Sequence, residues 1–262
     1  MAVMDGYEQG APCWFELATT DQTSAKQFYT QLFGWNANDF PTGPAGSYTM
    51  FDKGGQQSGA CYTLEPSMLE QGVPPNWGVY FAVKDVDAST AKTASLGGTV
   101  IAPAFDVMTF GRMSVCRDPG GAVFMLWQAK SHQGAGIYNE DNAVCWVELA
   151  TWDVPQARDF YTNLLGWKTK SSAGMETYVE YGLGGYPLGG LLPMDEKWKG
   201  IPSNWSIYLR VNDLDSYASK AKELGGAIMV PPFDVPNVGR MARLTDPQGA
   251  GFYLIQLANP SM

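Results

Sequence analysis

The chain has 262 residues, which is enough for two domains of roughly 130 residues, each with its own hydrophobic core. Apolar residues make up 45% and charged residues 16%, as in ordinary globular proteins, and 17 Lys and Arg against 26 Asp and Glu give a net charge of −9. This acidic balance argues against the basic surface on which nucleic-acid binding depends, so no nucleic-acid partner is expected.

The N-terminal stretch MAVMDGYEQG lacks the charged and then apolar pattern of a secretory signal. No apolar run approaches the roughly 18 residues that span a bilayer, so we expect a cytoplasmic protein with no membrane partner. The four cysteines stand singly in apolar runs without C-x-x-C spacing. They are predicted to be buried free thiols rather than metal ligands or redox groups.

An internal repeat divides the chain. CWFELATT at 13–20 recurs as CWVELATW at 145–152, and AKQFYTQLFGW recurs as ARDFYTNLLGW further along. The later matches include LGG, FDV, GRM and a DPxG turn. These matches predict a first domain at 11–128, a polar, Gly-containing linker at 129–142 and a second domain at 143–257.

Each copy contains the same order of elements. CWFELAT alternates as a strand does, and Asp21 caps a helix whose apolar residues recur at i, i+3, i+4 and i+7. Three short strands are expected after this helix, and the pattern then restarts with a strand at 77–83 and a helix at 86–96. The remaining strands are predicted near 34–37, 48–52, 59–64, 99–101, 113–116 and 123–128.

This order of elements, together with FYxxLFGW, VKDVD, LGG and DPxGxxFxLWQ, resembles the vicinal oxygen chelate superfamily, which includes glyoxalases, bleomycin-resistance proteins and extradiol dioxygenases. The chain is most similar to the tandem two-domain type, to which a mycobacterial antigen and a group of actinobacterial proteins labelled as hydroxylases belong. The resemblance implies an α+β fold with four βαβββ modules, paired into two half-open barrels with a ligand on the concave face. It does not specify a reaction, because this fold serves many functions.

Enzymes of the superfamily typically hold a divalent metal with His, Gln or Glu side chains that line the barrel. The resemblance implies that the corresponding positions here are occupied by residues that cannot ligate or ligate poorly, namely Trp14, Gly78, Met125, Trp146, Ser206 and Tyr253. The last position falls within 58–64 or 188–194, and neither stretch has a His, Glu or Gln. We therefore expect no metal and no cofactor. The only histidine, His132, is in the linker and is expected to be a solvated loop residue.

Strand alternation predicts which side chains face the barrel interiors. The inward positions are predicted to be Trp14, Glu16, Tyr80, Met113, Val115 and Met125 in the first copy, and Trp146, Glu148, Tyr208, Arg210, Met241, Arg243 and Tyr253 in the second. The first barrel is thus mostly apolar and aromatic around one carboxylate, and the second adds two arginines. Arg112 and Arg240 face away and are expected to form loop or interface ion pairs.

Glu16 and Glu148 permit two interpretations. Each accepts hydrogen bonds that fix the strands, or burial raises its pKa so that it acts as a general base. Their recurrence in unlike surroundings favours the structural role. Arg210 and Arg243 either bind an anionic ligand group or neutralise Glu148, and neutralisation is slightly favoured.

The leading hypothesis is a protein that binds a small, partly aromatic molecule in a barrel cavity without the usual metal. The alternative is an enzyme of the lyase or dioxygenase type that uses Glu16 or Glu148 as a base or as an irregular ligand of a divalent metal. A third possibility is an interaction protein whose barrel interiors are filled. Because four modules in one chain supply what two-module members obtain by dimerising, both a monomer and a homodimer are expected states.

Overall fold

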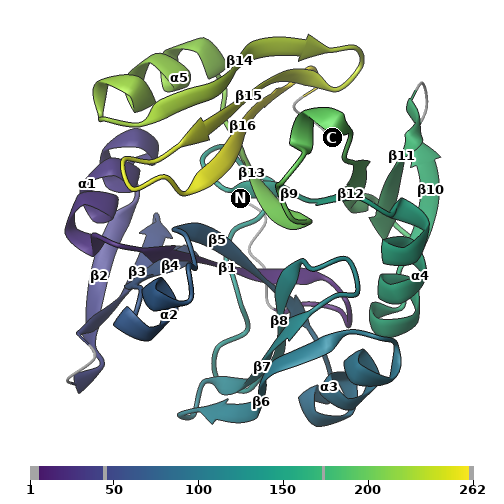
Figure 1. The fold of residues 1–262 in the computed structure, drawn as a ribbon. Coiled ribbons are helices and arrows are strands. Elements are labelled where there is room, and N and C mark those ends of the chain that lie inside the picture. Colours follow the sequence, from purple (N-terminus) through teal and green to yellow (C-terminus); the bar gives the residue numbers. More distant parts are fainter. Residues whose placement is uncertain (1–5, 44–45, 173–174, 260–262) are drawn as a thin grey trace.

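The computed structural model describes residues 6–43, 46–172 and 175–259. It contains two eight-stranded mixed sheets, one from each copy of the repeat, and neither sheet closes on itself (Figure 1). The expected α+β architecture of tandem half-open barrels is confirmed. Every helix within these ranges is too short or too polar to cross a membrane.

The first domain has the strand order β2-β3-β4-β1-β5-β8-β7-β6. Short α2 was not predicted from the sequence, and β2 begins two residues later than expected. The elements are β1 (Pro12–Thr19), α1 (Gln22–Phe33), β2 (Asn36–Pro41), β3 (Ser47–Lys53), β4 (Gln56–Thr63), α2 (Pro66–Glu70), β5 (Asn76–Ala82), α3 (Val86–Ser95), β6 (Thr99–Val107), β7 (Gly111–Arg117) and β8 (Val123–Ala129).

The second domain repeats this order as β10-β11-β12-β9-β13-β16-β15-β14. A single 3-10 turn, η2, takes the place of α2. The elements are β9 (Val144–Thr151), α4 (Val154–Leu165), β10 (Lys168–Ser172), β11 (Met175–Gly182), β12 (Pro187–Pro193), η2 (Glu196–Trp198), β13 (Asn204–Arg210), α5 (Leu214–Glu223), β14 (Ala227–Val235), β15 (Gly239–Thr245) and β16 (Gly251–Leu257).

Local sequence explains the limits of α1. The Asp21 carboxylate accepts a hydrogen bond from the Ser24 amide at 3.0 Å, which satisfies one of the free N–H groups at the helix start. The helix ends at Gly34, whose φ of 68° lies in the left-handed region that glycine adopts without steric cost. Because Gly34 serves as this cap, the next strand starts only at Asn36.

The two modules of each domain join along their first strands. β1 pairs antiparallel with β5, with Trp14 opposite Tyr80, and β5 pairs parallel with β8, with Tyr80 beside Met125. Residues that are directly paired point to the same side of a sheet, so these three side chains share one face. The three strands therefore bring these side chains to a common face, as strand alternation predicts.

The two domains are joined through the most recognisable motifs of the repeat. Tyr29 of α1 donates its hydroxyl proton to Asp246 in the second domain's DPxG turn at 3.2 Å and accepts from Trp77 Nε1 at 3.0 Å. In the mirrored contact, Tyr161 of α4 donates to Asp118 at 3.0 Å. Figure 1 shows the resulting exchange, with α1 beside α5 and α4 beside α3. The FYxxLFGW and DPxG motifs thus build a buried junction.

Replacing Tyr29 with Phe is expected to lower the free energy of unfolding by about 1–3 kcal/mol, because it leaves the buried Trp77 N–H and the Asp246 carboxylate each short of a partner. Urea denaturation followed by circular dichroism measures this loss. Tyr186→Phe is the control, since Tyr186 is 88% exposed and its substitution should cost within about 0.5 kcal/mol. Equal stability of the two variants would mean that the Tyr29 hydroxyl contributes nothing to the junction.

The segment between the domains is packed against the first barrel. The Ala135 amide donates to the Cys13 carbonyl at 2.8 Å, and Ala135 and Ile137 are each 1% exposed. Tyr7 is held here too, because its hydroxyl donates to the Ala135 carbonyl at 2.7 Å. The predicted buried free thiols are confirmed for all four cysteines.

Candidate functional site

Glu16 lies at the centre of the concave face of the first sheet. Its Oε1 accepts the Tyr48 hydroxyl proton at 2.6 Å, and its Oε2 accepts the Tyr80 hydroxyl proton at 2.6 Å. Trp14 Nε1 donates to the Tyr48 oxygen at 3.1 Å. Four side chains from β1, β3 and β5 therefore form one hydrogen-bonded chain across the sheet.

The second domain contains the same arrangement. Glu148 accepts from Tyr178 at 2.7 Å on one oxygen and from Tyr208 at 2.7 Å on the other. Trp146 Nε1 donates to the Tyr178 oxygen at 3.0 Å. Since the network recurs although the surrounding residues differ, it belongs to the shared architecture of the two modules.

Burial raises the pKa of both glutamates above the ordinary value, and the two tyrosine hydroxyls oppose that shift in each case. Glu148 is only 6% exposed, whereas Glu16 keeps partial contact with solvent. Each carboxylate oxygen accepts one strong hydrogen bond, which is what a buried charge needs. The geometry favours the structural interpretation over a general base with a free oxygen.

His132 lies against the concave face of the first barrel. Its ring meets Trp14 edge-on with centroids 4.5 Å apart and lies 5.7 Å from Trp127. Burial lowers its pKa to about 4, so the imidazole is neutral at physiological pH. The expectation of a solvated loop residue is wrong, because the linker folds back along β1 and carries His132 with it.

The rest of the first barrel wall is apolar. Met113 lies opposite Trp127 and Val115 opposite Met125 in the β7–β8 pairing, so these side chains extend the wall around Tyr80. Met113 and Val115 keep partial exposure, and Met125 is 9% exposed. The first barrel thus has the apolar and aromatic lining that the sequence predicts.

The second barrel has a different wall. The Tyr208 and Tyr253 rings stack with centroids 4.3 Å apart and an interplanar angle of 6°. The Arg243 guanidinium carbon lies 5.8 Å from the Tyr253 ring centre and 5.4 Å from that of Trp198 in η2. Met241 and Trp146 pack at the same cluster and remain half-buried. The result is an arginine held between aromatic rings.

Arg210, the other arginine predicted for the second barrel, makes different contacts from Arg243. Arg210 Nε lies 3.1 Å from the Asp141 carboxylate, and its Nη1 donates to the Asn139 carbonyl at 3.1 Å. Arg210 therefore ties the linker to β13. Glu148 is satisfied by tyrosines instead of by Arg210 or Arg243, contrary to the slightly favoured expectation of neutralisation.

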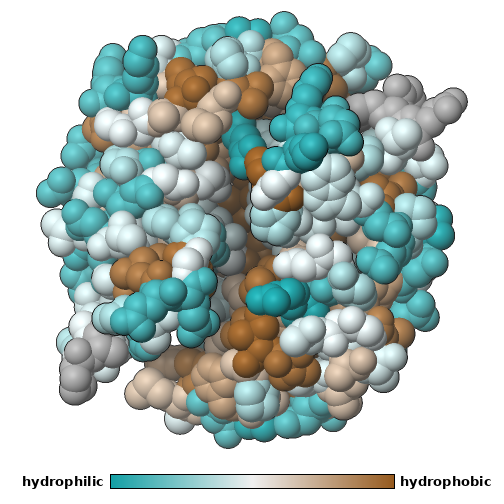
Figure 2. All heavy atoms as spheres, viewed as in Figure 1, coloured by the Kyte–Doolittle hydropathy of each residue, from teal (hydrophilic) through white to brown (hydrophobic). Residues whose placement is uncertain are grey.

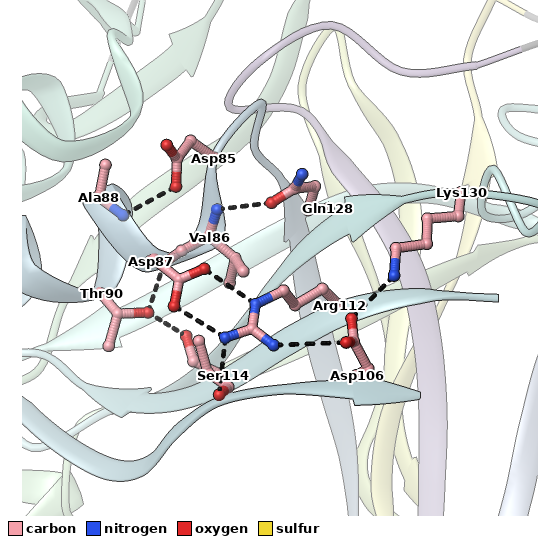
Figure 3. A network of polar contacts seen from close by, with 11 residues as sticks. Asp85, Val86, Asp87, Ala88, Thr90, Asp106, Arg112, Ser114, Gln128 and Lys130 are labelled. Carbon is pink, nitrogen blue, oxygen red and sulfur yellow. Dashed lines mark hydrogen bonds and ion pairs between the residues drawn. The ribbon is translucent and has the colours of Figure 1, made fainter. Parts of the chain in front are cut away.

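Arg112 and Arg240 point away from the concave faces, as parity predicts. Arg112 pairs with Asp87 at 2.8 Å and with Asp106 at 3.7 Å. Figure 3 shows Arg112 between these two carboxylates, with Lys130 also in contact with Asp106. Arg240 makes the equivalent pairs with Asp215 and Asp234. These surface ion pairs connect α3 to β7 in the first domain and α5 to β15 in the second.

The residues at the family's metal-binding positions do not fit a metal ion. Trp14 and Trp146 present indole N–H donors that are already bonded to tyrosines. Glu16 and Glu148, the carboxylates nearest to those positions, have both oxygens occupied by tyrosine hydroxyls. Within the described ranges, His, Cys, Asp and Glu side chains form no group of three that could hold a metal.

The molecular surface has a hollow on one side (Figure 2). Figure 2 shows a hollow that passes between η2 and β16 and continues between α2 and β8, with apolar side chains along parts of its walls. A pocket of about 130 Å³ lies beside Trp127 and residues 7–9, and another of about 190 Å³ lies beside β10 and β11. The two glutamates line neither of these two pockets.

Sequence reasoning missed Tyr48, Tyr178 and Trp198. The two tyrosines occupy matching places on β3 and β11, so their recurrence in both copies was a usable signal. Trp198 has no counterpart in the first copy, because the loop that carries it differs between the copies. Only the fold reveals that this loop reaches Arg243.

Comparison with known proteins agrees with this geometry. The family model of the Glyoxalase/Bleomycin resistance protein/Dioxygenase superfamily matches residues 13–126 and 144–254. The "Putative glyoxylase CFP32" of Mycobacterium tuberculosis is 42% identical over 255 residues, which cover 96% of this chain and 97% of that protein. The "Anthracycline biosynthesis protein DnrV" of Streptomyces peucetius is 35% identical over 266 residues, which cover 97% and 96%.

Among solved structures, the 2,3-dioxygenase LapB from Pseudomonas sp. KL28 superposes with a TM-score of 0.65 at 13% identity. The match covers 98% of this chain and 96% of LapB. This likeness concerns the fold alone. With both repeats matched by the family model, the chain belongs to the Glyoxalase/Bleomycin resistance protein/Dioxygenase superfamily.

Proposed function

We propose that the protein binds a small, partly aromatic molecule on the concave face of a barrel, without the metal that superfamily enzymes use. The observation that carries this proposal is the repeated Trp–Tyr–Glu–Tyr network. In this network Trp14 and Trp146 occupy positions where the family holds a metal. Their indole N–H groups are already hydrogen-bonded to tyrosines, which in turn donate to the glutamates. Half-buried aromatic side chains such as Tyr48 and Trp146 offer surface on which a planar ligand stacks.

The relatives guide the choice of ligand. One relative is named for anthracycline biosynthesis, and anthracyclines contain a planar polycyclic ring system. A planar anthraquinone is therefore a suitable first probe. We propose a cytoplasmic protein that is a monomer or a homodimer. The pairing of all four modules within one chain supports the monomer.

The second candidate is a superfamily enzyme in which Glu16 or Glu148 acts as a base. The raised pKa of both carboxyls favours it, because a base works best near the operating pH. The two tyrosine hydroxyls on each carboxylate oppose it, because hydrogen bonds to the charged form lower the pKa of the carboxyl and make it a weaker base. Binding without catalysis accounts better for this geometry.

One purified sample tests both candidates. We expect less than stoichiometric Mn, Fe, Ni and Zn by elemental analysis, and saturable quenching of tryptophan fluorescence on titration with an anthraquinone. Trp146→Ala should weaken binding about tenfold through lost stacking, whereas exposed Trp152→Ala should leave it unchanged.

Glu148→Gln separates the candidates further. The variant keeps a side chain of the same shape, so ligand binding should persist within about threefold. One tightly held metal ion per chain, or turnover that Glu148→Gln or Glu16→Gln abolishes, would overturn the binding proposal in favour of the enzyme.

A further inference from the structure

We propose that the second barrel selects planar aromatic ligands that carry a carboxylate, which binds the guanidinium of Arg243. This inference rests on the proposed binding function and names the ligand class of one of the two barrels. The first barrel has Val115 at the matching place and lacks this selectivity.

Arg243 has aromatic partners. Its guanidinium lies over the rings of Trp198 and Tyr253, and within the described residues it forms no ion pair with a carboxylate within 4 Å. Aromatic faces stabilise the cation but accept few of its five N–H donors. Arg243 therefore retains donors for an incoming acceptor.

Glu148 is the carboxylate of the second Trp–Tyr–Glu–Tyr network. Its oxygens are both occupied, by Tyr178 and by Tyr208. The Tyr253 ring stacks on Tyr208, and Arg243 lies over that same Tyr253 ring. The rings of Tyr208 and Tyr253 thus lie between Arg243 and the buried Glu148 carboxylate, and Arg243 remains partly exposed to solvent.

The flat groups of this site favour a flat ligand. Trp198, Arg243, Tyr253 and Tyr208 form a continuous series of flat groups in contact. An aromatic ring adds to such a series by stacking, and a carboxylate in the plane of that ring presents two oxygens to the planar fork of a guanidinium. Trp146 and Met241 supply the half-buried apolar floor beside it. An aromatic carboxylate therefore fits both the stacked aromatic side chains and the guanidinium of Arg243.

The test compares 2-naphthoate with 2-naphthamide, its neutral isostere, by isothermal titration of the full chain at about pH 7, where the carboxylate is ionised. We expect 2-naphthoate to bind at least about tenfold more tightly than 2-naphthamide, because a hydrogen bond to a charged group is among the stronger polar contacts. Arg243→Gln should remove this preference while retaining 2-naphthamide binding. Arg240→Gln is the matched control, since Arg240 lies on the same strand with its charge paired on the opposite face.

The outcomes separate this inference from the function on which it rests. Binding of 2-naphthamide without preference for 2-naphthoate, or a preference that survives Arg243→Gln, overturns the role of Arg243 and leaves aromatic binding standing. Binding of neither compound overturns both. Titration with 1-naphthyl phosphate and with acetate completes the test. Tighter binding of the phosphate than of the carboxylate, or binding of acetate as tight as that of 2-naphthoate, overturns the aromatic carboxylate as the ligand class.

Discussion

Replacing Trp167 with Ala is expected to lower the free energy of unfolding by about 3–5 kcal/mol, a large share of the total stability of an ordinary domain. Trp167 is 2% exposed and stacks on Tyr181 with ring centroids 3.7 Å apart. Its ring also meets Phe81 of the first domain at 5.5 Å, and its Nε1 donates to the Gly10 carbonyl at 2.8 Å. Truncation leaves a cavity at the junction of the two domains and an unpaired carbonyl.

Chemical denaturation followed by circular dichroism measures this loss. Because Trp167 contacts residues of both domains, we expect one cooperative transition that moves as a whole to lower denaturant. Trp152→Ala is the matched control, since Trp152 is 48% exposed and its removal should cost less than about 1 kcal/mol. Two separate transitions, with only that of the second domain displaced, would contradict a shared core.

Most of the fold can be predicted from the internal repeat and from the periodicity of apolar residues. Apolar spacing and the Asp21 cap predict α1, and strand alternation assigns Trp14, Glu16 and Tyr80 to one face, as the register of β1 and β5 shows. These features are local, so a single sequence displays them. The short α2 and η2 lack such periodicity, because their few residues are held by turns rather than by an amphipathic face.

The contacts of the site are less predictable than its face. Alternation assigns Glu16 to the concave side but says nothing about which hydroxyl reaches it, and Tyr48 comes from β3, which is two strands away in the sheet. Arg210 is likewise assigned correctly to β13, yet its partner Asp141 belongs to the linker. His132 lies on the barrel because that linker returns along β1. Each of these contacts depends on the path that the chain takes between strands. The periodicity of the sequence does not encode that path.

Tyr208→Phe is expected to lower the free energy of unfolding by about 1–3 kcal/mol at neutral pH, because it leaves one oxygen of the buried Glu148 carboxylate without a donor. The loss should depend on pH. The folded-state pKa of Glu148 already lies above its ordinary value through burial, and removing a hydrogen bond that favours the charged form raises this pKa further. A carboxyl of this kind stabilises the fold below its unfolded pKa and loses that contribution as pH rises through the folded value.

The deficit of Tyr208→Phe relative to the unmodified chain should therefore be largest near neutral pH and shrink as pH falls toward the ordinary glutamate pKa, where Glu148 becomes protonated in the folded state. Denaturation curves across this range measure it. Tyr253→Phe is the matched control, because it removes a hydroxyl from the same ring stack and leaves both hydrogen bonds to Glu148 in place. In a Glu148→Gln background the pH-dependent part of the deficit should vanish, since that side chain carries no charge to protonate. If the deficit persists there with the same pH dependence, another group is responsible and Glu148 is not the residue that the tyrosines stabilise.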